Sequence, residues 1–306
     1  MGSIFITIEL KMPFPHLLLV LLVVVIWGVN FLFVKIGLTE ISPLLLCTLR
    51  FVLAAFPAIF FVKPPKIPFK LIVGYGIFMF VLQFGFIFLG MDIGMTPGMA
   101  SLIMQVQIVF SLLFSAIFLG ERPTLYQLVG SCISFLGIAL VGGHLDADIS
   151  LLGFICILAA AASWGFGNLI TKKINAVDLI SVIVWGSFVA IFPMLLFALM
   201  FEGWANVIKS YHQLTWMGMG SLAYIVYVST WIGYGAWTWL IGRYSVGLIV
   251  PFALLIPVVS MLGSSLLMGE PFQSWKLVAG LLVISGLGIN LFGARLPTRA
   301  QPEMIT

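Results

Sequence analysis

A few polar side chains stand inside the long apolar stretches of this 306-residue chain, and they are the residues most able to do chemistry. Asn30 and Gln83 carry amides, and Arg50 carries a guanidinium that does not readily lose its proton. An amide or a charge that meets lipid without a partner costs kilocalories, so such groups face protein or water. These residues therefore indicate binding of a polar small molecule, with packing between helices as the alternative.

The residue patterns that enzymes and nucleotide-driven pumps need do not occur in this sequence. It has no Walker A stretch, zinc signature or nucleophile elbow. The histidines are dispersed near predicted segment ends and loops, and the cysteines are isolated within apolar stretches without metal-ligand spacing. These residues are His16, His144, His212, Cys47, Cys132 and Cys156. We expect no enzyme activity, no cofactor and no bound metal.

The composition determines which kind of element positions the polar residues. The chain is 62% hydrophobic and 8% charged, whereas soluble domains carry about 25% charged residues. A membrane-spanning helix needs about 20 apolar residues and a short connection, so the length allows about ten helices. The apolar runs lack the period-two alternation of a β-barrel. The net charge is +4. The basic residues responsible for it lie mostly in short loops, where they contact anionic lipid rather than nucleic acid.

Proline, glycine and charged residues divide the chain into ten predicted membrane spans. Ser42-Pro43, Thr96-Pro97 and Glu270-Pro271 are typical breaks between them. The predicted spans are 14–36, 42–62, 69–92, 96–119, 124–142, 150–173, 178–201, 214–241, 245–268 and 273–293.

Lys and Arg are distributed unequally between the two predicted sides of the membrane. With a cytoplasmic N-terminus, ten of them fall on the cytoplasmic side and three on the other, while Arg50 lies within a span. Loops rich in Lys and Arg stay in the cytoplasm. We therefore predict a multi-pass protein of the inner (plasma) membrane with both termini in the cytoplasm.

The sequence repeats itself. Trp27 and Lys35 recur as Trp164 and Lys172 with the same spacing of eight, and Gly120-Glu121 recurs as Gly269-Glu270. We predict two repeats of five helices, at residues 1–145 and 146–306. Because five spans is an odd number, the second copy crosses the membrane in the opposite sense, as in many secondary transporters that work by alternating access. Alternatively, the duplication merely built a stable bundle.

Three short motifs carry a resemblance to a known family. They are Trp27-Gly28-Val29-Asn30-Phe31 with Lys35, Leu49-Arg50-Phe51, and Gly120-Glu121-Arg122. With them the chain resembles the drug/metabolite transporter superfamily, and more narrowly its ten-span EamA-type exporters. Further stretches, including Gly74-Tyr75-Gly76 and Gly233-Tyr234-Gly235, are similar to bacterial exporters of O-acetylserine and cysteine. The resemblance implies export of amino acids and related metabolites.

Helical spacing suggests which side chains line a substrate cavity. Positions four apart share a helix face, so Trp164 and Asn168 form one stripe with Lys172. Tyr227, Trp231 and Tyr234 lie too near mid-span for an interfacial belt. Packing between helices is the alternative role for each polar residue. The predicted substrate-binding residues are Asn30, Gln83, Gln105, Trp164, Asn168, Tyr227, Trp231 and Tyr234.

A second set of residues could act through charge or bending. Lys35 and Lys172 could contact substrate or gate its path, although snorkelling to headgroups is simpler. Arg50 could bind a substrate carboxylate or form a structural pair. Pro251 and Pro257 leave backbone carbonyls unpaired and permit a hinge, or are tolerated kinks.

The acidic residues lie at span ends rather than in the middle of the membrane. Asp92, Glu121 and Glu270 are examples, and proton-coupled carriers usually keep an ionisable relay in the membrane. The sequence thus favours facilitated or exchange transport, and Glu121 and Glu270 are expected to end helices or pair with cations.

Together these features predict a secondary transporter that exports small polar metabolites, such as amino acids or O-acetylserine and cysteine. The alternatives are a transporter of drugs, nucleotide sugars or aromatic metabolites, or a membrane scaffold. The expected partners are a small-molecule substrate and membrane lipid, without nucleic acid.

Overall fold

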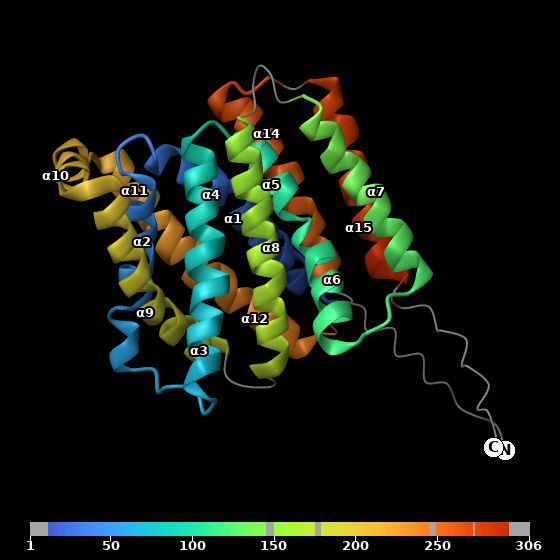
Figure 1. Ribbon diagram of the computed structural model, residues 1–306, viewed down its shortest axis with the longest axis horizontal. Helices are drawn as coiled ribbons and strands as arrows, with labels where there is room; N and C mark the ends of the chain where they lie inside the picture. Colours follow the sequence, from blue (N-terminus) through green and yellow to red (C-terminus); the bar gives the residue numbers. More distant parts are fainter. Residues whose placement is uncertain (1–11, 145–149, 175–178, 245–248, 272, 294–306) are drawn as a thin grey trace.

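The computed structural model is a bundle of helices that stand side by side (Figure 1). Within the residues that the structure describes, every regular element is a helix. The predicted junction of the two repeats, between residues 145 and 146, lies outside them. The described residues are 12–144, 150–174, 179–244, 249–271 and 273–293.

In this part of the chain the helices form ten successive segments. They are α1 (Phe14–Gly37); α2 (Pro43–Ala55) with η1 (Ala58–Phe60); α3 (Phe69–Tyr75), η2 (Gly76–Leu82) and α4 (Gln83–Asp92); α5 (Pro97–Met104) and α6 (Gln107–Leu119); α7 (Leu125–Gly142); α8 (Leu151–Ile174); α9 (Leu179–Phe197), η3 (Ala198–Glu202) and α10 (Gly203–Gln213); α11 (Trp216–Ala223), η4 (Tyr224–Gly233) and α12 (Tyr234–Arg243); η5 (Val250–Leu255) and α14 (Ile256–Met268); and α15 (Ser274–Gly293).

The segments have the length and composition of membrane spans. Among the described residues, eight helices are long and apolar enough to cross a membrane, and a shorter apolar helix covers Phe252–Met268. Backbone polar groups in a bilayer must be satisfied internally, which a helix achieves alone. The predicted class of an all-α, multi-pass membrane protein is confirmed.

Helix ends follow local sequence signals. The Thr96 hydroxyl accepts a hydrogen bond from Met99 N at the start of α5, and Thr124 and Gln127 form a reciprocal capping box at the start of α7. α6 and α14 are each followed by a capping glycine, Gly120 and Gly269, with φ of 68° and 69°. That left-handed conformation favours glycine, and its recurrence at equivalent positions reflects the sequence repeat.

The repeat is also visible in how the two halves pack on each other. α1 of the first half packs against α14 of the second, while α8 of the second half packs against α6 of the first. A Cβ added to Gly28 would lie 2.6 Å from Val259 Cβ, and one added to Gly165 would lie 2.7 Å from Phe110 Cβ. Glycine at these matching positions lets each helix pair approach closely.

α7 and α15 form a closely packed pair at one edge of the bundle (Figure 1). A Cβ on Gly130 would lie 2.4 Å from Gly286 O, so the two backbones touch. Asn290 Nδ2 donates to Ser131 Oγ at 3.0 Å and to Gln127 O at 3.2 Å. Small residues and one buried amide therefore hold this pair together.

Several segments depart from the plain α-helices that the sequence predicts. η2, η3 and η4 are π-helical, and η5 is a 3-10 helix. The predicted span 178–201 continues through η3 into α10, which ends at Gln213. Gly203, at φ 78°, allows the change of direction there, because the left-handed region suits glycine.

Candidate functional site

Arg50 is a buried cation at a point where elements of both halves meet. It lies on α2, and its side chain is 2% exposed. Its Nη2 donates to Thr230 Oγ1 of η4 at 3.2 Å, and its Cζ lies 3.8 Å from the centre of the Phe84 ring of α4. The guanidinium also interacts electrostatically with Tyr234 of α12. We call Arg50, Phe84, Thr230 and Tyr234 the Arg50 cluster.

Aromatic rings extend the Arg50 cluster toward α1. The Trp27 ring lies 5.2 Å from the Tyr234 ring and 5.1 Å from the Trp237 ring, centre to centre. Trp27 Nε1 donates to Ser229 O at 3.1 Å, which fixes the indole against η4. Tyr75 is buried on α3, and its ring lies 5.2 Å from the Phe80 ring, centre to centre. Four segments thus converge here: α1, α2, the α3–α4 segment and the η4–α12 segment.

Asn30 and Gln83 are buried amides with an unpaired oxygen. They are 9% and 3% exposed, and neither Asn30 Oδ1 nor Gln83 Oε1 has a hydrogen-bond partner among the described residues. A buried acceptor without a partner costs about 1–3 kcal/mol. Both amides were predicted to bind substrate; nothing in the structure tests that role, and the unpaired oxygens leave it open.

Gln105 lies where two interrupted helices meet. It sits between α5 and α6, and its Nε2 donates to Ala253 O of η5 at 2.8 Å. η5 leads into α14, so each half contributes one interrupted helix to this contact. Pro257 is buried in the first turn of α14, and Pro251 belongs to η5. Secondary transporters use such interrupted helices to expose backbone groups to their substrates.

The hydrogen-bond partners of Asn168 are not residues of the Arg50 cluster. Its Nδ2 donates to Gln107 Oε1 at 2.8 Å and to Ser111 Oγ at 2.9 Å, which joins α8 to α6. These bonds agree with the packing alternative for Asn168. Its substrate-binding role, like those of the half-buried Trp164 and Trp231, stays a prediction.

The two lysines of the repeat have different partners. Lys35 Nζ donates to Met91 O at 2.6 Å and interacts electrostatically with Asp92. Lys172 forms an ion pair with Glu121 in which both side chains are about half exposed. Because the pair is exposed, solvent screens it and it contributes at most about 1 kcal/mol.

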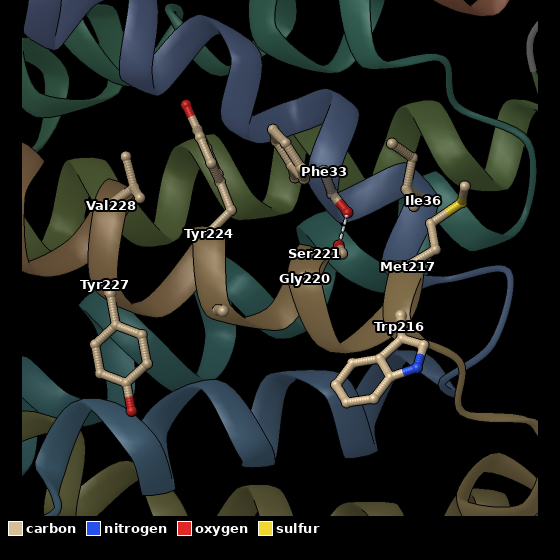
Figure 2. Close-up of a pocket in the computed structure, with 10 residues that line it drawn as sticks. Phe33, Ile36, Trp216, Met217, Gly220, Ser221, Tyr224, Tyr227 and Val228 are labelled. Atoms are coloured by element: carbon tan, nitrogen blue, oxygen red, sulfur yellow. Dashed lines mark hydrogen bonds between the residues drawn. The ribbon is translucent and has the colours of Figure 1, made fainter.

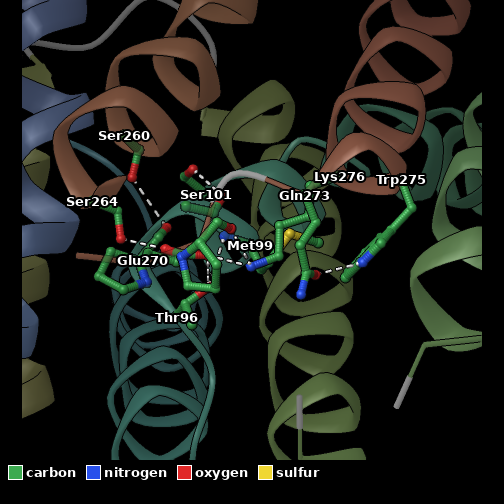
Figure 3. A network of polar contacts seen from close by, with 12 residues as sticks. Thr96, Met99, Ser101, Ser260, Ser264, Glu270, Gln273, Trp275 and Lys276 are labelled. Atoms are coloured by element: carbon green, nitrogen blue, oxygen red, sulfur yellow. Dashed lines mark hydrogen bonds and ion pairs between the residues drawn. The ribbon is translucent and has the colours of Figure 1, made fainter. Parts of the chain in front are cut away.

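A buried polar network closes the end of α14 (Figure 3). Glu270 accepts hydrogen bonds from Thr96 Oγ1 at 2.7 Å and from Ser264 Oγ, and it forms an ion pair with Lys276 at 3.1 Å. Lys276 is 2% exposed. Glu121 and Glu270 therefore pair with cations near helix ends, as expected from the sequence.

An open groove lies between α1 and the segment formed by α11 and η4 (Figure 2). Its volume is about 620 Å³. Phe33 stacks on Tyr224 at 3.9 Å between ring centres, and Ser221 Oγ donates to Phe33 O. Tyr227, one of the predicted substrate-binding residues, lines this groove and is 48% exposed. The lining is mostly apolar, so the groove suits an acyl chain or a hydrophobic side chain better than a polar metabolite.

Comparison with protein families decides what kind of protein this is. The model of the EamA-like transporter family matches residues 15–143 and again residues 151–292. The chain belongs to the EamA-like transporter family. The two matches lie in tandem, so the duplication inferred from the sequence is a duplication of the family's domain. This EamA-like chain is a membrane transporter and not an enzyme.

Related sequences cover nearly the whole EamA-like chain. A protein of Salmonella typhimurium named "Probable amino-acid metabolite efflux pump" is 40% identical, over 92% of this chain and 97% of the relative. A protein of Escherichia coli K12 with the same name is 39% identical, over 90% of this chain and 95% of the relative. A crystal structure with 19% identity matches with a TM-score of 0.63, over 93% of this chain and 99% of that one, which shows a shared fold.

Sequence reasoning missed two residues of the Arg50 cluster. Thr230 and Phe84 contact the predicted residue Arg50. Threonine and phenylalanine are ordinary in apolar helices. The available signal was a spacing of four between Thr230 and Tyr234, which places both on one helix face.

Proposed function

We propose that this chain is a secondary transporter that exports small polar metabolites, namely amino acids or derivatives such as O-acetylserine and cysteine, across the inner membrane. The observation that carries the proposal is the 40% identity to a protein named "Probable amino-acid metabolite efflux pump", over nine tenths of both chains. Identity of this extent across all ten helical segments preserves the architecture on which a substrate site is built.

The chemistry of the central residues supports a polar, partly charged substrate. Arg50, Asn30 and Gln83 are buried on three segments, of which α4 contacts both α1 and α2. Each has at least one polar atom without a partner among the described residues. Amino acids carry a carboxylate, an ammonium and often a polar side chain, and these groups match the donors and acceptors present.

The proposed transport cycle follows from the repeat. The two halves pack on each other through equivalent helix pairs, α1 on α14 and α8 on α6. Rocking of one half against the other would open a central site to one side and then to the other. The interrupted helices that meet at Gln105 and Ala253 supply a contact at which this movement could be accommodated.

We further propose that substrate exchange proceeds without an imposed pH gradient. The described acids near the spans lie at helix ends and have partners. Glu121 pairs with Lys172, Glu270 pairs with Lys276, and Glu202 accepts from the first turn of α2. Asp92, the last residue of α4, lies near Lys35. A proton-coupled carrier usually holds its relay deeper in the membrane.

Counterflow in proteoliposomes tests the proposed function. Vesicles that contain the purified protein are loaded with one unlabelled compound and given a trace of labelled serine, cysteine or O-acetylserine outside. We expect loading with amino acids or O-acetylserine to drive uptake of the label, and loading with a nucleotide sugar to leave uptake at the protein-free level. The reverse pattern of loading would contradict the proposal.

The same vesicles test the coupling. Exchange should continue at equal internal and external pH with a protonophore present. Because a coupled carrier can also exchange, the decisive measurement is net uphill movement after a pH jump. If such movement occurs and disappears in Lys35→Gln or Lys172→Gln, transport is proton-coupled through a lysine.

A further inference from the structure

The hydrogen bonds of Arg50 leave most of its guanidinium unused. A guanidinium has five N–H donors in a fixed plane. Nη2 donates to Thr230 Oγ1, whereas Nε and Nη1 are buried and have no partner among the described residues.

The charge of Arg50 is also uncompensated in this part of the chain. The ion pairs found among the described residues are Lys172–Glu121 and Lys276–Glu270. The Glu202 carboxylate lies at the start of α2, where it accepts from Ser42 Oγ at 2.6 Å and from Leu44 N at 2.7 Å. A fixed positive charge buried without an anion is strongly unfavourable. Among the described residues no acid pairs with this guanidinium, so a bound anion would compensate its charge.

The geometry of the free donors selects the kind of anion. The two hydrogens of Nη2 point to different edges of the guanidinium, one shared with Nε and the other with Nη1. One hydrogen of Nη2 is donated to Thr230 Oγ1. The edge on the side of the other Nη2 hydrogen therefore keeps two free N–H donors. Two parallel N–H donors match the two oxygens of a carboxylate. A carboxylate held there would make two charge-assisted hydrogen bonds.

The walls around Arg50 strengthen such a contact. Phe84 covers the guanidinium at 3.8 Å, and Tyr234 is backed by Trp27. Rings at these distances keep water away, and electrostatic attraction is stronger where water is excluded. The Thr230 hydroxyl also donates to Ile225 O at 3.0 Å, which leaves its lone pairs directed to Arg50 and fixes the orientation of the guanidinium.

We propose that Arg50 binds the carboxylate of the transported amino-acid metabolite, with Thr230 holding the guanidinium in place. The proposal rests on the proposed function for the identity of the ligand. It adds that the free carboxylate is required for recognition, and that an ester or amide of the same amino acid is rejected.

Ligand analogues test this on the wild-type protein without relying on a variant that could misfold. Binding of O-acetylserine and serine to the purified protein is measured by calorimetry, beside serine amide and serine methyl ester, which keep the ammonium and lose the anionic group. Loss of the two charge-assisted bonds should weaken binding roughly 10- to 100-fold or more. Equal binding of the acid and the amide would overturn the proposal.

Variants then assign the effect to Arg50. Arg50→Gln should bind acid and amide equally, and Arg50→Lys should restore part of the preference, since an ammonium keeps the charge but not the two-point geometry. Arg243→Gln is the matched control, because Arg243 is exposed and stacks 4.4 Å from Trp239. It should retain the wild-type preference. A full preference for the acid in Arg50→Gln would overturn the assignment.

The outcomes separate this proposal from the proposed function. If the vesicles exchange amino acids but the protein does not distinguish acid from amide, the Arg50 site is wrong and the function stands. If no amino acid exchanges, but succinate or benzoate stabilises the wild type against heat and not Arg50→Gln, a carboxylate site exists and the substrate class is wrong. If neither occurs, both are wrong.

Discussion

The Thr230 hydroxyl takes part in two hydrogen bonds, one with Arg50 at 3.2 Å and one with Ile225 O at 3.0 Å. Thr230→Val keeps the shape of the side chain and removes both bonds, so it leaves a further N–H of a buried cation unpaired. We expect the free energy of unfolding in detergent to fall by about 1–3 kcal/mol. Thr230→Ser keeps the hydroxyl and serves as the control. A Thr230→Val protein as stable as the wild type would show that Arg50 finds another acceptor.

At the residue scale, the sequence identifies the charge but not its surroundings. Arg50, Asn30 and Gln83 could be selected because polar groups in apolar helices are costly and need a reason. Thr230 and Phe84 could not, because their roles depend on which helix faces meet, and the chain alone does not specify how helices are rotated against each other. For the same reason, the sequence could not decide whether Asn168 binds substrate or packs against a neighbouring helix.

Glu202 connects two elements from different repeats. Its carboxylate, at the end of η3, accepts from Leu44 N at 2.7 Å and Leu45 N at 3.2 Å in the first turn of α2. These N–H groups have no partner inside their own helix. The start of a helix carries a partial positive charge, which attracts the negative carboxylate. Glu202→Gln should lower the free energy of unfolding by about 0.5–2 kcal/mol, measured by chemical denaturation in detergent.

Glu121→Gln is the control for Glu202. Glu121 pairs with Lys172 where both side chains are about half exposed, so its neutralisation should change stability by less than about 1 kcal/mol. A larger loss for Glu121→Gln than for Glu202→Gln would contradict the account of the α2 cap.

Glu40 makes the contact between the α1–α2 loop and α11 dependent on pH. The hydroxyl and the backbone N–H of Thr215 donate to its carboxylate, and these bonds lower the pKa of Glu40 below its ordinary value. The lowered pKa means that the stabilisation is complete above the ordinary glutamate pKa and is lost as the pH falls through the lowered value. In Glu40→Gln, the unfolding temperature should lose this acid-dependent component. An unchanged acid dependence would contradict the assignment.

At the element scale, composition and helix-breaking residues predict where segments begin and end, but not how each helix is wound. The π-helical segments η2 and η4 insert extra residues into a turn without changing hydropathy. α10 is more polar than a span, so hydropathy ended the predicted span at residue 201. Winding depends on close contacts such as Gly233 against Trp27, which only the packed structure specifies.

For the whole molecule, the bias in basic residues predicts which side faces the cytoplasm. Lys66 lies in the loop between η1 and α3, Gln213 is the last residue of α10, and both are exposed. In a protein without its native cysteines, an impermeant thiol reagent added to intact cells should label Gln213→Cys and not Lys66→Cys. Permeabilised cells, where both should react, are the control. Labelling of Lys66→Cys alone would reverse the orientation.

The two halves are alike in sequence but differ at their outermost ion pairs. Lys172 on α8 pairs with Glu121 at the end of α6. The matching residues are Lys35 on α1 and Glu270 at the end of α14, where the helices pack in the same way. Lys35 instead donates to Met91 O, and Glu270 pairs with Lys276. The ends of α6 and α14 lie at opposite ends of the bundle (Figure 1).

Inverted repeats exchange their conformations when a transporter changes from one side to the other. We therefore expect the opposite-facing state to pair Lys35 with Glu270 and to separate Lys172 from Glu121. Cysteine pairs at 35/270 and at 121/172 in a protein without its native cysteines test this by cross-linking. Each pair should form a disulfide in part of the population, and linking one should block the other. A Ser131→Cys, Asn290→Cys pair, placed where α7 and α15 touch, should link in both states. Simultaneous linking of 35/270 and 121/172 in one molecule would show that the two halves do not exchange conformations.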